Sequence, residues 1–261
     1  MIQGYVNSAT EKGSRPYQED RFVVIRHETR EEKGWLLAVM DGHGGSEVAA
    51  FCEENLSIYF NNLSASVFEY SDTALENMLK DIISELNEKT KHMYCGSTVS
   101  MAYISETREK AYVAILGDSP VIILNDRGSF IISPEHNARN NIAEREAAIK
   151  RGATYSDGYL RDQNMNHRLQ LTRALGDLSL DKFLNREPQI YSVNLGLKSF
   201  VVVMSDGVVD PGHNNKNGEA IPGYLASIIS NGGTATDLVN DALKRQTGDN
   251  VTAVLWKQPK E

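Results

Sequence analysis

The sequence predicts an α+β fold in which antiparallel sheets are covered by helices. Seven short apolar runs rich in Val, Ile and aromatic residues have the length and composition of strands. Turn-like segments such as SETREK and NDRGS join several of these runs and are too short for a helical crossover. Stretches with helical periodicity stand apart from the runs, which disfavours a doubly wound parallel sheet.

The elements follow one another along the whole chain. The predicted strands are 22–25, 35–40, 99–104, 111–116, 121–124, 200–204 and 251–256. Apolar residues at helical spacing follow Ser46, the expected N-cap of the first helix, and Gly152 ends the third. The predicted helices cover 48–63, 75–86, about 141–151, and either 223–230 or 236–245. The polar segment 212–220 has the composition of an exposed loop.

Composition places the chain among soluble globular proteins. With 27 basic and 35 acidic residues it carries a formal charge of −8, which argues against nucleic acid or an anionic membrane as a partner. Only Cys52 and Cys95 occur, without metal-ligand spacing, as expected for a reduced intracellular protein. No leader pattern and no apolar run of membrane-spanning length is present, so we expect a cytoplasmic protein.

Acidic residues recur where the predicted strands begin or end. They are Asp41, Asp118, Asp206 and Asp249, together with the pair Glu19 and Asp20 before the first predicted strand. One such aspartate usually only starts a turn, but several carboxylates that meet in space cannot all remain ionised without positive charge between them. No Lys or Arg recurs beside these aspartates, and the His and Cys that zinc prefers are missing there, so oxygen ligands indicate Mg²⁺ or Mn²⁺.

Seven motifs in order carry a family resemblance. They are RPYQED (15–20), VMDGHGG (39–45), GSTVSMAYI (96–104), ILGDS (115–119), LTRALGD (171–177), MSDGVVD (204–210) and GDNVTAVL (248–255). In order and spacing they resemble the metal-dependent serine/threonine protein phosphatases of type 2C. The resemblance implies one catalytic domain over 1–261, built as a four-layer α-β-β-α sandwich of two antiparallel sheets flanked by helices. It also implies a flap subdomain at about 133–170.

The resemblance assigns roles to individual residues. Asp41 would bridge two Mg²⁺ or Mn²⁺ ions, with the Gly42 carbonyl, Asp206, Asp249, Glu19 and Asp20 completing their shells. A third, weaker ion would be held by Asp118, Asp206 and Asp210. Arg15 would grip the substrate phosphate, and His43 would be the general acid that protonates the leaving serine or threonine oxygen. Arg173 and Asp177 would hold the flap to the core, and no role falls to His92 or His136.

The implied reaction is hydrolysis of phosphoserine and phosphothreonine in proteins. A water or hydroxide shared by the two ions would attack phosphorus in line, without a phosphoenzyme intermediate. The implied partners are phosphorylated proteins, and the enzyme would be a monomer.

Two other readings remain open. A catalytically silent relative would act as a scaffold, although such proteins usually lose metal aspartates, and none is missing here. A phosphodiesterase or nuclease uses the same two-ion logic, but the acidic balance and the lack of a basic, aromatic-studded stripe argue against it.

Overall fold

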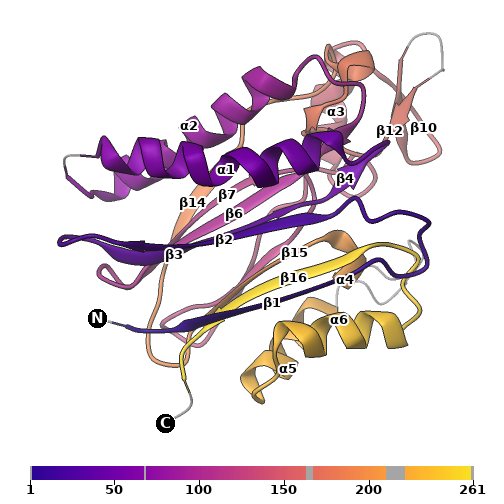
Figure 1. Cartoon of the computed structure of the whole chain (residues 1–261). Coiled ribbons are helices and arrows are strands. Elements are labelled where there is room, and N and C mark those ends of the chain that lie inside the picture. The colour runs from indigo at the N-terminus through magenta and orange to yellow at the C-terminus, as the bar shows by residue number, and fades with distance from the viewer. Residues whose placement is uncertain (1, 68, 163–166, 210–220, 260–261) are drawn as a thin grey trace.

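Two five-stranded antiparallel sheets pack face to face in the computed structural model (Figure 1), which describes residues 2–67, 69–162, 167–209 and 221–259. Sheet A has the order β1 (Tyr5–Glu11), β16 (Val251–Lys257), β15 (Phe200–Met204), β8 (Val121–Leu124) and β9 (Phe130–Ile132). Sheet B has the order β14 (Gln189–Asn194), β7 (Lys110–Leu116), β6 (Val99–Ser105), β3 (Lys33–Met40) and β2 (Arg21–Glu28). All seven predicted strands are therefore confirmed.

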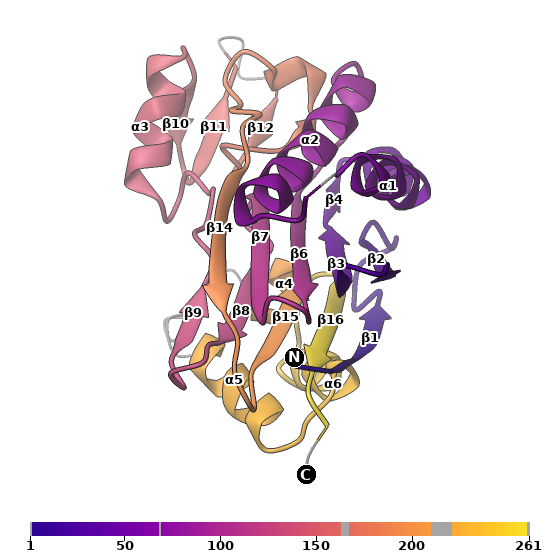
Figure 2. The ribbon, with the colours of Figure 1, turned by 90° about the vertical axis from the view of Figure 1, so that its left-hand side faces the viewer.

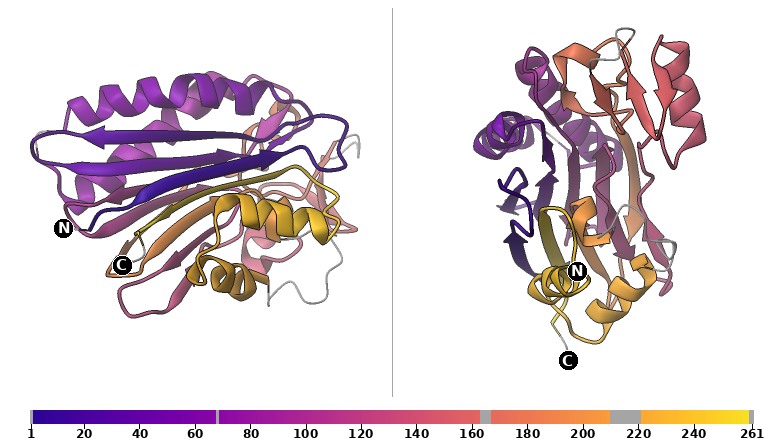
Figure 3. Two further views of the ribbon diagram at one scale, coloured as in Figure 1. Left: turned by 60° about the horizontal axis from the view of Figure 1, so that its bottom comes forward. Right: turned by 90° about the vertical axis from the view of Figure 1, so that its right-hand side faces the viewer.

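Helices cover the outer face of each sheet, as Figure 3 shows. Sheet B is covered by α1 (Glu47–Ala65) and α2 (Asp72–Thr90), and sheet A by α5 (Ile221–Ser230) and α6 (Ala235–Lys244). Both alternatives for the fourth predicted helix thus exist. Ser46 takes the N-cap position of α1, but its side chain makes no capping hydrogen bond. None of the helices within the described ranges has the length and apolar composition of a membrane span.

The core consists of three apolar layers, one between the two sheets and one between each sheet and its helices. Leu37, Val39, Val113 and Val203 belong to the layer between the two sheets, where every side chain named is fully buried. One further layer joins sheet B to α1 and α2, and another joins sheet A to α5 and α6. The chain thus forms the four-layer α-β-β-α arrangement that the sequence predicted.

A small unit, which includes α3 (Ile142–Lys150) in Figures 1 and 2, stands at the end of the sandwich where α4 (Asp206–Val209) and β4 (Gly42–His43) also lie. It also contains the sheet β10 (Thr154–Ser156), β11 (Tyr159–Arg161) and β12 (Arg168–Leu169). Its own apolar cluster includes Leu160 and Phe183, so the packed unit extends beyond the predicted limit of 170. That this unit is a flap stays a prediction. The predicted loop 212–220 lies outside the described residues.

A short sheet and a 3₁₀ turn complete the end of the sandwich next to this unit. β4, β5 (Gly96–Ser97) and β13 (Leu175–Gly176) form a three-stranded sheet, and the 3₁₀ turn η1 (Leu178–Leu180) follows it. This small sheet brings the segment after β3 against two segments that lie far away in the sequence.

Candidate functional site

Five aspartates from separate segments gather at the end of the sandwich where β3 and β15 finish. Asp41 directly follows β3, Asp118 follows β7, and Asp206 begins α4 just after β15. Asp249 precedes β16, and Asp20 precedes β2. The charges of Asp20, Asp118, Asp206 and Asp249 all act on Asp41, so the structure brings together the aspartates that the sequence predicted to converge.

Burial and mutual repulsion change the titration of these carboxyl groups. Burial, followed by the charges of the other four aspartates, raises the pKa of Asp41 well above its usual 3.8. Burial and then the charges of Asp118, Asp249 and Asp20 raise the pKa of Asp206 well above 3.8, although a hydrogen bond with Asp41 lowers it. Burial raises the pKa of Asp20 to about 6, although the Thr252 hydroxyl donates a hydrogen bond of 2.7 Å to its Oδ2. The aspartates are therefore crowded together, and groups of the protein itself do not fully relieve their mutual repulsion.

Arg15 reaches this cluster from the β1–β2 connection. Its Nη2 lies 2.7 Å from Oδ2 of Asp249, and its Nε donates to the carbonyl oxygen of Gly248 at 2.8 Å. The expectation that no basic side chain compensates the aspartates is therefore wrong for Asp249. The Arg15 side chain is still 42% exposed, so its guanidinium faces solvent at the mouth of the site.

Asn250 fixes the loop that carries Arg15 and Glu19. Its Nδ2 donates to the carbonyl oxygens of Lys12 and Tyr17, and its Oδ1 accepts from the Glu19 N–H at 2.8 Å. The carbonyl oxygen of Glu19 lies close to Gly42, and a Cβ at position 42 would be 2.6 Å from it. Glycine is thus required at position 42, and the Gly42 backbone lies beside the cluster.

His43 is paired with a residue that the sequence did not assign to it. Its Nε2 lies 2.8 Å from Oδ2 of Asp177, which follows β13. Burial alone would lower the pKa of His43, but the hydrogen bond and charge of Asp177 outweigh it and raise that pKa above 6.5. Asp118 and Glu19 add to the rise, which places His43 next to the acidic cluster.

Arg173 contacts α3, which agrees with the role predicted for it, whereas Asp177 contacts His43. Arg173 donates from Nε to Oε2 of Glu144 at 3.1 Å and so holds α3 to the core. Asp177 instead orients His43 across the small sheet. The signal was present at Gly96, where a Cβ would lie 2.1 Å from Oδ2 of Asp177 and 2.4 Å from Nε2 of His43. Only glycine leaves room for this pair.

Asp118 has its own partner, also missed from sequence. Nδ2 of Asn137 donates to its Oδ2 at 2.7 Å, and Asn137 is buried. Burial raises the pKa of Asp118, whereas this hydrogen bond lowers it. Asp210, the remaining residue predicted for a third ion, lies outside the described residues.

The donor set fits hard divalent cations. The side chains that gather here offer carboxylate oxygens, the donors that Mg²⁺ and Mn²⁺ prefer, and a cation would relieve the repulsion that raises the pKa values of Asp41 and Asp206. Across the described ranges, no three His, Cys, Asp or Glu side chains already form a complete ligand set. Arg15, Asn137 and Thr252 instead donate hydrogen bonds to oxygens of Asp249, Asp118 and Asp20, so a cation would compete with these donors.

The chain is similar to known protein phosphatases. A family model described as protein phosphatase 2C matches residues 6–251. Protein phosphatase 2C homolog 1 of Schizosaccharomyces pombe is 24% identical, with 97% of this chain and 72% of that protein covered. Probable protein phosphatase 2C 45 of Oryza sativa is 29% identical, with 97% and 86% covered.

Solved structures share the fold. A serine-threonine phosphatase 2C from Toxoplasma gondii superimposes with a TM-score of 0.74 at 18% identity, covering 98% of this chain and 95% of that one. A sex determining protein of Caenorhabditis elegans reaches a TM-score of 0.79 at 24% identity. That alignment covers 97% of this chain but 64% of the nematode chain.

Proposed function

Since the chain belongs to the protein phosphatase 2C family and is a protein serine/threonine phosphatase, we propose that its aspartate cluster is a divalent-cation centre for hydrolysing phosphoserine and phosphothreonine. One observation carries the proposal. Carboxylates from five separate segments, of which Asp20 is buried and the other four are half-buried, are crowded together, and the pKa values of Asp41 and Asp206 are raised well above 3.8. Such crowding is costly unless cations belong there.

We assign the cation ligands to this cluster. Asp41 would hold two Mg²⁺ or Mn²⁺ ions together with the Gly42 carbonyl, Asp206 and Asp249, with Glu19 and Asp20 as further ligands. Asp118 and Asp206, with Asp210, would hold a third and weaker ion. When bound, the ions neutralise phosphoryl oxygens and lower the pKa of the attacking water, so no phosphoenzyme is needed.

Arg15 is proposed to bind the substrate phosphate. The planar guanidinium can donate two hydrogen bonds to two phosphoryl oxygens, and its position at the exposed mouth of the site suits that contact. In the absence of substrate it is held by Asp249 at 2.7 Å. Binding of phosphate would therefore release an oxygen of Asp249 as Arg15 turns outward.

His43 is proposed to donate a proton to the departing serine or threonine oxygen. Asp177 accepts from its Nε2, and the resulting rise in the pKa of His43 keeps more of the ring protonated near neutral pH. The proton for the leaving group then comes from the other ring nitrogen, Nδ1. Since every group named here belongs to one chain, a monomer is the proposed active unit.

Phosphopeptide hydrolysis by the purified protein tests this function. We expect turnover of phosphoserine and phosphothreonine peptides with Mn²⁺ or Mg²⁺, none of phosphotyrosine peptides or phosphodiesters, and complete loss with a chelator. Asp206→Asn should abolish turnover while the protein stays folded, and Asp81→Asn on the exposed face of α2 serves as the control. A lack of turnover under every divalent ion would favour a scaffold, and cleavage of diesters would favour a nuclease.

A further inference from the structure

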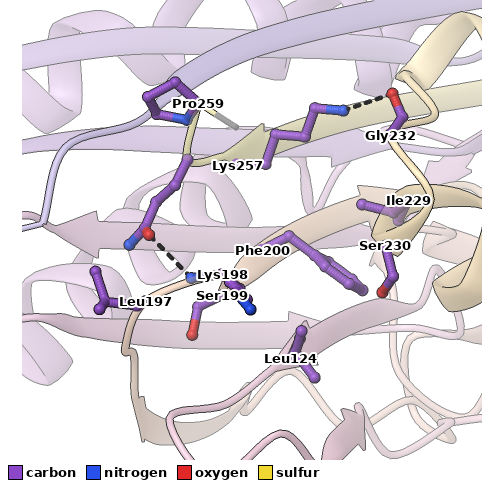
Figure 4. Close-up of a pocket in the computed structure, with 11 residues that line it drawn as sticks. Leu124, Leu197, Lys198, Ser199, Phe200, Ile229, Ser230, Gly232, Lys257 and Pro259 are labelled. Carbon is purple, nitrogen blue, oxygen red and sulfur yellow. Dashed lines mark hydrogen bonds between the residues drawn. The ribbon is translucent and has the colours of Figure 1, made fainter. Parts of the chain in front are cut away.

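A pocket of about 500 Å³ lies at the opposite end of sheet A from the aspartate cluster (Figure 4). Phe200 and Lys257, which line it, stand at the far ends of β15 and β16 from Asp206 and Asp249. Six residues of extended strand separate Lys257 from Val251, which is about 20 Å. The pocket is therefore separate from the proposed catalytic centre, and its volume is within the roughly 300–1,000 Å³ typical of binding sites.

The walls of the pocket are largely apolar. Leu124 of β8, Phe200 of β15 and Ile229 of α5 form its interior, and Leu197 stands at its rim (Figure 4). Leu197 is 81% exposed, so its side chain extends the apolar surface of the pocket outward to solvent.

The apolar surface continues from the pocket onto strand β9. Phe130 contacts Phe200 with ring centroids 6.1 Å apart, and it pairs with Leu124 across β8 and β9. Ile132 lies two residues further along β9 and therefore on the same face. Phe130 and Ile132 are 46% and 48% exposed, so an elongated strip rather than a closed cavity is left uncovered. A small molecule would fill the pocket but leave this strip bare.

Charge at the pocket is opposite to that of the whole protein. Lys198 and Lys257 line it, and no Asp or Glu is among the lining residues, in a chain of formal charge −8. The Lys257 amine donates to the Gly232 and Gly233 carbonyl oxygens at 3.0 and 2.6 Å, so mainly its aliphatic stem is offered. Lys198 is exposed and forms no ion pair with any described carboxylate. Its charge is available to a partner.

Hydrogen bonds fix the backbone of the turn that carries Lys198. Its φ of +73° is left-handed, and its N–H donates to Oε1 of Gln258 at 3.0 Å. Nε2 of the same Gln258 donates to the Gly196 carbonyl oxygen at 3.0 Å. Both sides of the turn are thus fixed to the chain that follows β16, which holds Leu197 and Lys198 at the rim.

We propose that this surface, defined by Leu124, Phe130, Leu197, Lys198 and Phe200, docks an extended protein segment with aliphatic residues flanked by acidic ones. Aliphatic side chains would enter the pocket and cover the strip, and acidic side chains would face Lys198. β9 is the edge of sheet A among the described strands, so a segment lying along it can also form backbone hydrogen bonds. Because the surface lies away from the aspartate cluster, a docked partner leaves the cluster open.

Peptide binding measured by fluorescence anisotropy tests the proposal. The probes are labelled octapeptide pools with Leu, Ile or Val at alternate positions and Asp or Glu at the rest. Matched pools carry Lys or Arg in place of the acids, or Ser and Asn in place of the aliphatic residues. We expect saturable binding of the acidic aliphatic pool, at least tenfold weaker binding of the other two, and amide chemical-shift changes concentrated at 122–132 and 196–200.

Two variants locate the site without touching the core. Leu197→Glu should weaken binding of the acidic aliphatic pool at least tenfold, because it removes an anchor and adds repulsion. Lys198→Met should weaken it about two- to fivefold, as expected for one exposed ion pair. Lys89→Met, at an exposed position on α2, is the matched control and should change nothing. Unchanged melting temperatures show that each variant is folded.

Three results would overturn the proposal. These are equal binding of the acidic and basic pools, full affinity in Leu197→Glu, and absence of saturable binding to any pool. A concentration-dependent dimer that Leu197→Glu abolishes would show that a second copy of the chain covers this surface instead. None of these outcomes depends on phosphatase activity.

Discussion

Asp20 provides a direct test of the electrostatic argument. Its carboxyl group is 3% exposed, and its pKa is raised from 3.8 to about 6. A carboxylate whose folded pKa is raised contributes stability that is fully present below pH 3.8 and is lost as the pH rises through about 6. Without divalent cations, the wild-type protein should therefore lose stability over this window, and Asp20→Asn should not lose that contribution.

The magnitude follows from the two pKa values. Each pH unit between them corresponds to roughly 1.4 kcal/mol, so ionising Asp20 costs the folded state about 3 kcal/mol at pH 7. About half a kcal/mol of this cost is already present at pH 4, so the free energy of unfolding of Asp20→Asn should gain roughly 2 to 2.5 kcal/mol on that of the wild type between pH 4 and pH 7. Removing this charge also relieves Asp41 and Asp206, which acts in the same direction.

Urea denaturation at pH 4, 5, 6 and 7 with a chelator measures this difference. The value at pH 4, where folded Asp20 is protonated, reports the effect of the amide on the Thr252 hydrogen bond and is subtracted. Asp81→Asn on α2 is the exposed control. Saturating Mn²⁺ should shrink or reverse the gain, because the wild-type carboxylate then faces a cation. A difference that stays flat from pH 4 to pH 7, or falls, would refute the reasoning.

Three further variants are predicted to change catalysis or cation binding. His43→Gln should slow phosphopeptide hydrolysis about 10²- to 10⁴-fold but barely affect p-nitrophenyl phosphate, whose leaving group needs no proton; equal losses would remove His43 as the acid. Asp177→Asn should lower the pKa of His43, so the loss of phosphopeptide activity on raising the pH should begin at a lower pH than in the wild type. An unchanged alkaline side of the pH–activity profile would exclude this coupling. Arg15→Ala should lower kcat/KM about 10- to 100-fold, with partial rescue by Arg15→Lys. The same alanine variant frees Asp249, so a Mn²⁺ titration should show tighter binding; weaker binding would contradict the competition.

Strands that are buried on both sides could be predicted from sequence, whereas three of the four described edge strands of sheets A and B, β1, β9 and β14, could not. The fourth, β2, was predicted from its apolar centre FVVI. β3 and β16 are almost continuously buried and read as apolar runs. β1 has the sequence YVNSATE and is half exposed or exposed throughout, because it is an edge strand with a solvated face. β14, an edge strand of sheet B, was missed for the same reason. Such strands are formed by their neighbours rather than by an apolar pattern of their own.

The site divides in a similar way. Aspartates at strand ends carry a local signal, and their convergence could be predicted because the strands share one sandwich. The pairs His43–Asp177 and Arg15–Asp249 join residues 134 and 234 positions apart. No periodicity encodes such a contact. Only the glycine at position 96, which leaves room for the histidine and its carboxylate, hinted at the first pair.

The aspartates are shared between the two halves of the sandwich. Asp41 follows a strand of sheet B, and Asp206 and Asp249 flank strands of sheet A. No single hairpin or half-molecule therefore possesses the complete constellation, which comes into being only after the halves have docked. Cations bound there would stabilise the protein only after the two sheets have packed together. They should therefore slow its unfolding far more than they accelerate its folding. The lifetime of the folded protein, as well as its catalysis, would then depend on the concentration of divalent cations.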